Sequence, residues 1–189
     1  MKNPHSRPVP VFIAILAIAI ALPSAVAAVS SELWDAAENC ACGLGDGLGA
    51  LVDSGNRKVA KAANRTCAAI RTAREEADGQ DVAGYLKALE KAAKRGRRAL
   101  RVADRKGFET ETLRCAFEDL RVATRRIIEA GIAEVKARPD FVTKDAVVRA
   151  VAKAERGLDF AREALAGKRP YVKSFAAYRQ AWAALAKFL

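Results

Sequence analysis

A dense group of basic side chains lies between positions 87 and 106. Nine of these twenty residues are basic, and only Glu90 and Asp104 are acidic. The nine are Lys87, Lys91, Lys94, Arg95, Arg97, Arg98, Arg101, Arg105 and Lys106. On a helical wheel of about 100° per residue they fall within an arc of roughly 180°, opposite an apolar arc. The first eight, which we call the basic ridge, are therefore our candidate anion-binding residues.

Two interpretations of the basic ridge remain open. Lys and Arg are good helix formers, so the ridge could be an ordinary solvated face of a soluble protein. However, like charges four residues apart, such as Lys87 and Lys91 or Arg97 and Arg101, repel and destabilise a helix unless a partner offsets them. That excess predicts contact with an acidic protein, lipid headgroups or a cell-wall polymer. Nucleic acid is disfavoured, because no aromatic residues interleave with the ridge as stacking platforms.

Four cysteines, Cys40, Cys42, Cys67 and Cys115, form the second group with available chemistry. An even number in an exported chain predicts two disulfides. Direct closure of Cys40 with Cys42 is disfavoured by the tight loop, so we expect these two to pair, in unknown order, with Cys67 and Cys115. A redox or soft-metal site at Cys40-Ala41-Cys42 is the alternative. Paired zinc-knuckle spacings are absent, and we expect no metal and no cofactor.

The first thirty residues have the pattern of a secretory signal peptide. A basic start is followed by an unbroken apolar run from Val11 to Leu22, then by Pro23 and the small-residue motif Ala25-Val26-Ala27. We expect cleavage near Ala27, so that residues 1–27 are the leader. The alternative is an uncleaved membrane anchor, because the segment 9–29 carries no charge and is about long enough to span a bilayer.

Removal of the leader narrows the chemistry that the mature chain can perform. It takes away Met1 and His5, the only Met and the only His, and lowers the formal charge from +11 to +9. Without imidazole the mature chain has no Ser-His-Asp or Cys-His nucleophile system, and it offers no His ligand to zinc or haem iron. We therefore expect a protein that is not an enzyme.

The elements that must position these residues are predicted to be helices throughout. No stretch beyond Ser30 alternates with a period of two, so the fold class is all-α. Turn residues and caps place helices at about 31–41, 56–77, 81–106, 110–138, 143–166 and 171–189. Asp78-Gly79 and Gly107 are predicted stops, and Thr143 is a predicted N-cap. The Gly-rich segment between positions 43 and 55 could be either a loop or a helical turn.

Short connections between helices of this length favour antiparallel neighbours. The sequence thus predicts one helical-bundle domain, 28–189, made of an N-terminal piece (28–55) and a bundle proper (56–189). It would be an antiparallel bundle of five to six helices stapled by disulfides. The predicted apolar stripe of its second helix is Val59, Ala63, Thr66, Ile70, Ala73 and Ala77.

These observations predict an exported, periplasmic or extracellular binding or adaptor protein of the cell envelope, which contacts an anionic partner through its basic ridge. A structural subunit of a larger envelope or membrane-associated complex is the alternative. An enzyme is the third hypothesis, and it would need Tyr, Lys, carboxylate or Cys chemistry alone. The sequence does not distinguish oligomeric states.

Overall fold

The computed structural model describes residues 48–79, 81–167 and 169–189. This part of the chain holds six α-helices and a single 3-10 turn, with no strand. The elements are α2 (Leu48–Val52), α3 (Arg57–Asp78), α4 (Val82–Asp104), α5 (Glu111–Ala137), α6 (Asp145–Glu163), η1 (Ala164–Ala166) and α7 (Pro170–Leu185). The prediction of an all-α helical bundle is confirmed. The count of six includes α2, which lies in the segment that the sequence left open between loop and helix.

Local capping explains where the first two long helices begin. The Asn56 side chain accepts hydrogen bonds from the backbone N–H groups of Lys58 and Val59, at 3.1 and 3.3 Å. The Asp81 carboxylate does the same for Gly84, at 2.9 Å. Both side chains satisfy amide donors that have no partner inside their helix.

The end of α4 and the start of α6 can be compared with the predicted stop at Gly107 and the predicted N-cap at Thr143. Gly107 has a φ of +72°, a conformation that favours glycine, just after α4 ends. The predicted cap at Thr143 is wrong, because α6 begins at Asp145 with Lys144 as its N-cap. The Thr143 hydroxyl instead donates to the carbonyl of Asp140 at 3.3 Å, which stabilises a turn before the helix.

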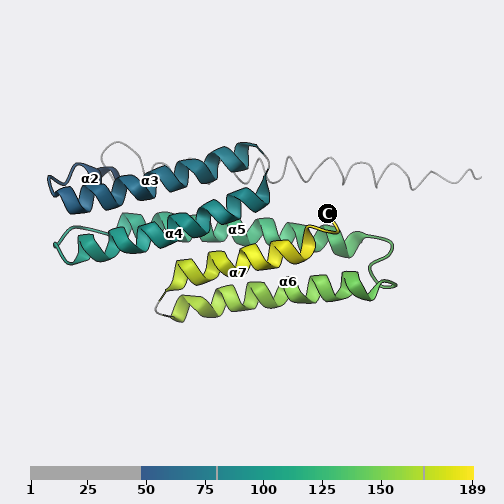
Figure 1. Cartoon of the computed structure of the whole chain (residues 1–189). Coiled ribbons are helices and arrows are strands. Elements are labelled where there is room, and N and C mark those ends of the chain that lie inside the picture. The colour runs from purple at the N-terminus through teal and green to yellow at the C-terminus, as the bar shows by residue number, and fades with distance from the viewer. Residues whose placement is uncertain (1–47, 80, 168) are drawn as a thin grey trace, which may run out of the picture.

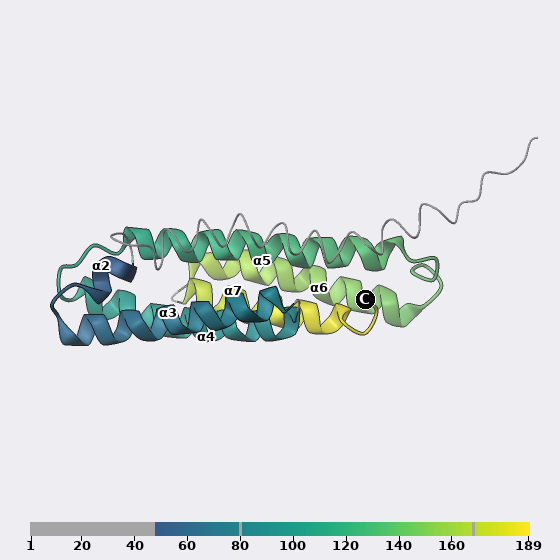
Figure 2. The ribbon, with the colours of Figure 1, turned by 90° about the horizontal axis from the view of Figure 1, so that it is seen from above.

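The long helices lie side by side in an elongated antiparallel bundle (Figure 1). Helix α7 packs against α4, α5 and α6 and so occupies the middle of the bundle. Helix α3 packs chiefly on α4, and the short α2 packs on α3 (Figure 2). The α3–α4 hairpin is therefore one edge of the molecule, and α4 joins that edge to the rest.

The core follows the apolar faces that the sequence predicts. In α3 the predicted stripe is buried from Val59 to Ala73, and only Ala77 is half-buried. Small residues allow close helix contact: a Cβ added at Gly96 of α4 would lie 2.2 Å from the Phe117 ring of α5. Tyr85 of α4 is also buried, and its hydroxyl is 3.3 Å from that of Thr124 in α5. These two contacts define the junction between α4 and α5.

Several expectations fall outside the described residues. They are the leader at 1–27, the helix at 31–41, and the cysteines Cys40 and Cys42. Among the helices of the described ranges, none combines the length and apolarity needed to cross a bilayer.

Candidate functional site

The α3–α4 hairpin brings two basic segments together that are far apart in sequence. Because the helices are antiparallel, the first half of α3 lies beside the second half of α4 (Figure 1). The α3 segment contributes four basic residues and the α4 segment two. They are Arg57, Lys58, Lys61 and Arg65 from α3, and Arg95 and Arg98 from α4. We call this set of six the basic groove.

The surface between the two segments is hollowed. A cavity of about 600 Å³ is lined by Lys58, Lys61, Ala62, Arg65, Arg95, Arg98 and Val102. A shallower hollow continues from it past Arg57 and Asn64. Ala62 and Val102 are the two apolar residues in the lining of the cavity, and the other five are basic. The groove is thus concave and open to solvent, as a site for an extended ligand would be.

The electrostatics of the groove are one-sided. None of the described residues that line the cavity is acidic. The Arg95 guanidinium donates through Nη1 to the carbonyl of Arg65 at 3.0 Å, which ties the side chain across the two helices. Within the described ranges, none of the six groove residues forms an ion pair. The six basic side chains therefore line this hollow and its shallower continuation with no acidic partner among the described residues.

The structure divides the predicted basic ridge among three surroundings. Arg95 and Arg98 line the groove. Arg97 and Arg101 lie on the other side of α4, in a separate pocket that faces the start of α7. The remaining four, Lys87, Lys91, Lys94 and Arg105, are exposed and line neither hollow.

Glu90 neutralises part of the ridge. Its carboxylate accepts from Lys94 Nζ at 2.6 Å and from Arg179 Nε of α7 at 2.9 Å. Partial burial alone would raise the pKa of Glu90, but these two cations outweigh it and hold the pKa below its usual value. Lys94 is exposed but already forms an intramolecular ion pair, so it is a weaker candidate for ligand binding than Arg98.

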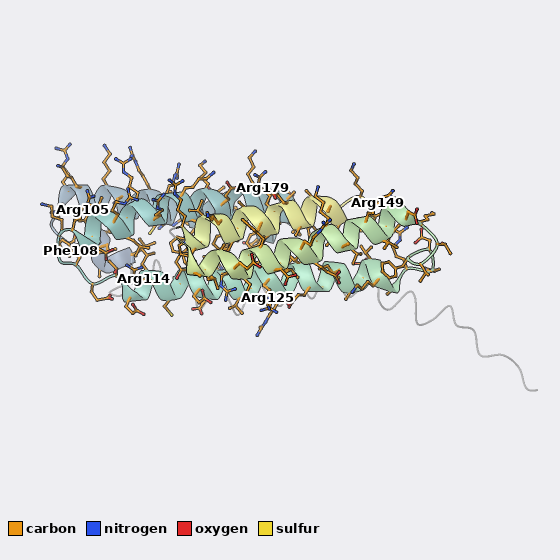
Figure 3. The ribbon with its side chains drawn as sticks, turned by 90° about the horizontal axis from the view of Figure 1, so that it is seen from below. Arg105, Phe108, Arg114, Arg125, Arg149 and Arg179 are labelled. Carbon is orange, nitrogen blue, oxygen red and sulfur yellow. The ribbon has the colours of Figure 1, made fainter. Side chains whose placement is uncertain are left out.

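Figure 3 shows how the basic side chains are distributed between the two long edges of the bundle. Nitrogen-tipped side chains project outward along the edge formed by α3 and α4, toward the end of the bundle where Arg105 lies. Arg114 and Arg125, on α5, lie on the opposite edge of that view. Arg125 has its own partner, since its Nε donates to Glu129 at 2.7 Å.

The two described cysteines occupy different environments. Cys67 is buried in α3, and Cys115 is exposed on α5 with its Sγ 3.7 Å from an Asp119 carboxylate oxygen. No disulfide joins Cys67 to Cys115. Pairing of these two with Cys40 and Cys42 stays a prediction, because both partners lie outside the described residues. In the described part of the chain, no three His, Cys, Asp or Glu side chains are grouped as metal ligands would be.

The α3 half of the groove is not among the predicted site residues, although the sequence contains a signal for it. Arg57, Lys58, Lys61 and Arg65 recur at helical spacing, and no acidic residue follows them on α3 until Glu75.

Comparisons with protein-family models, curated proteins and solved structures give no match for this chain.

Proposed function

We propose that this protein is an exported, non-catalytic binding or adaptor protein of the cell envelope that holds an acidic, chain-like partner in the basic groove. One observation carries the proposal: six basic residues line a concave surface and form no ion pair within the described part of the chain. Mutual repulsion of these charges weakens the free protein, and a polyanion would relieve it. This arrangement of charge, which folding alone does not require, supports the proposal.

The shape of the site favours an extended anionic chain over a flat anionic surface as the ligand. Lys58, Lys61 and Arg65 face Arg95 and Arg98 across the hollow, so a ligand lying between the helices meets cations on both sides. An acidic polypeptide segment or an anionic cell-wall polymer has this form. A plane of lipid headgroups would meet mainly the outer rim of the groove. We therefore rank lipid below polymer and acidic protein among the partners.

Export and disulfide stapling belong to the same proposal. The leader pattern supports secretion, and an oxidising compartment supports disulfides between Cys40 or Cys42 and the two described cysteines. Intact mass before and after reduction, on protein purified from the culture or the periplasm, tests both points. Two disulfides with residues 1–27 missing is the expected result. Four reactive thiols would overturn the staple, and a retained leader would favour the membrane anchor.

The groove is tested with a defined polyanion. We expect a fluorescent heparin oligosaccharide to bind the purified protein, and replacement of Lys61, Arg65, Arg95 and Arg98 by Gln to weaken binding by roughly 100-fold, at about 1 kcal/mol or less per surface charge. The matched control replaces four basic residues of α6, Arg149, Lys153, Arg156 and Arg162, by Gln. It removes the same charge from a different face, so we expect a change of less than about fivefold.

Equal losses of heparin affinity in the two variants would contradict binding in the basic groove, because net charge alone would then account for the affinity. Vesicles containing anionic lipid provide the second arm. If they bind with the same dependence on the four groove residues and heparin does not, the partner is a membrane surface. Circular dichroism of both variants confirms that each remains helical, so that a loss of binding is not a loss of fold.

A further inference from the structure

A second pocket lies on the side of α4 that faces away from α3. It forms where α4, α5 and the first turn of α7 meet, and its volume is about 270 Å³. The lining residues are Ala93, Arg97, Leu100, Arg101, Asp104, Arg114, Arg169, Pro170, Tyr171 and Val172. Four of them carry guanidinium groups and one is acidic. None is a member of the basic groove.

The single carboxylate of this pocket is already engaged. Asp104 accepts from Arg114 Nη2 at 3.2 Å and from the Thr110 hydroxyl at 2.8 Å. The other three guanidinium groups, those of Arg97, Arg101 and Arg169, form no ion pair in the described ranges. Desolvation, together with the charges of Arg169 and Arg101, lowers the pKa of Arg97. Three guanidinium groups without an ion-pair partner among the described residues therefore line one small hollow.

The rest of the pocket is apolar and held in place. Leu100 and Ala93 are buried and form part of the wall. The Tyr171 ring stacks on Phe117 with centroids 5.5 Å apart, and its hydroxyl donates to the carbonyl of Arg114 at 3.2 Å. Both contacts fix the orientation of this ring, so the aromatic part of the pocket lining is preformed beside the cations.

We propose that this pocket is a second, separate anion site that takes a phosphate monoester carried on a flat apolar body. A phosphate monoester has close to two negative charges and three acceptor oxygens, which suits three guanidinium donors. The flat body would lie against Tyr171, Leu100 and Val172. A pocket of about 270 Å³ limits the ligand to a small molecule or to the end group of a larger one. This site does not depend on the function proposed for the basic groove.

The test uses phenyl phosphate as the probe and inorganic phosphate as its comparison, titrated into the full-length purified protein by calorimetry. We expect phenyl phosphate to bind at least about tenfold more tightly, because only it places an apolar ring on the wall. Replacement of both Arg97 and Arg169 by Gln should weaken phenyl phosphate binding by about 30-fold or more. Equal affinity for the two probes would overturn the assignment of the apolar wall, and no measurable binding of phenyl phosphate would overturn the site.

Arg98→Gln is the matched control, since Arg98 belongs to the groove and lies one position from Arg97. It should leave phenyl phosphate binding within about twofold and should weaken heparin binding. A similar loss of phenyl phosphate binding in Arg98→Gln and in the double variant would show a general charge effect and contradict the second site. Thermal unfolding of all variants distinguishes lost binding from lost structure.

Discussion

The α3–α4 hairpin and the α5–α6 pair are built from helices of similar length and differ sharply in charge. Helices α3 and α4 carry thirteen basic and five acidic residues, whereas α5 and α6 carry nine of each. The balanced pair neutralises its cations locally, as Arg125 does with Glu129, Lys136 with Glu155 and Arg162 with Asp159. Long helices therefore form in the α5–α6 pair without excess charge, and the excess on the hairpin supports the anionic ligand that we propose.

The two regions meet at the contact between α4 and α5. Tyr85 and Gly96 of α4 contact Thr124 and Phe117 of α5, so α4 is basic on one face and tightly packed on the other.

The first prediction concerns salt. If the six groove residues contact a polyanion, the affinity for heparin should fall by roughly 1,000-fold between 50 and 200 mM salt, because each neutralised charge releases a counterion. A titration at four salt concentrations measures the slope of log Kd against log salt. The variant with Gln at Lys61, Arg65, Arg95 and Arg98 should lose more than half of that slope. An unchanged slope would place the contacts elsewhere.

The second prediction concerns the junction at alkaline pH. Burial raises the pKa of Tyr85 to about 12, and the hydrogen bond with Thr124 offsets only part of this effect. The unfolded chain releases this proton near pH 10, so the folded state loses stability as pH rises from 10 to 12, by about 2 to 3 kcal/mol in all. Urea unfolding at pH 9, 10.5 and 11.5 measures the loss.

Tyr85→Phe provides the control for that measurement. The variant has no phenol to ionise, so its stability should decline less steeply over the same range. Tyr171 and Tyr178 also have raised pKa values through burial, which leaves some decline in the variant. If the free energy of unfolding fell equally steeply with pH in both proteins, ionisation of Tyr85 would carry no cost in the folded state. That result would contradict the burial of Tyr85.

The third prediction concerns packing at the same junction. Gly96→Ala places a methyl group only 2.2 Å from the buried Phe117 ring, so either the ring or the helix backbones must shift. We expect a loss of about 1 to 2 kcal/mol in the free energy of unfolding, because the cost of overpacking exceeds the helix-forming advantage of Ala. Chemical denaturation measures it.

Gly79→Ala is the matched control, since its φ is negative and the added Cβ would come no closer than 3.4 Å to another atom. This variant should be within about 0.5 kcal/mol of the parent protein. Combining Gly96→Ala with Phe117→Leu should cost less than the sum of the two single changes, since the smaller side chain removes the clash. Full additivity would argue against direct contact.

The fourth prediction contrasts single charges in the two regions. Arg98→Gln in the groove should raise stability by about 0.3 kcal/mol at low salt, since it relieves repulsion without breaking an ion pair. Arg125→Gln on α5 should lower stability by a similar amount, because it removes the pair with Glu129. Opposite signs in low-salt thermal unfolding, converging at 1 M salt, are expected. Two changes of the same sign would contradict the proposed difference between the regions.

Much of the fold could be predicted from the sequence, because its determinants are local. Asn56 and Asp81 cap the helices that the pattern of apolar residues predicts, and Gly107 follows the end of α4. Thr143 misled the prediction because a capping residue type also stabilises turns, and only the chain geometry distinguishes the two.

The candidate site could be predicted only in part. A helical wheel places Arg95 and Arg98 on an exposed arc, but it does not show that Arg65, 33 positions before Arg98, faces them across a hollow. The division of the ridge is hidden for the same reason. Arg97 differs from Arg98 by about 100° around the helix, and Arg169 reaches the pocket of Arg97 from the connection before α7. Both facts depend on which helices become neighbours.

The central place of α7 has a consequence for the order of folding. The α3–α4 hairpin joins segments that are adjacent in sequence, so it can form as soon as both have been synthesised. Residues that contact α7, such as Glu90 of α4 through Arg179 and Phe117 of α5 through Tyr171, must wait for the last helix of the described chain to arrive. During that interval the apolar faces of three helices lack their cover. Until α7 docks, these exposed apolar faces leave the partly folded chain prone to association with other chains.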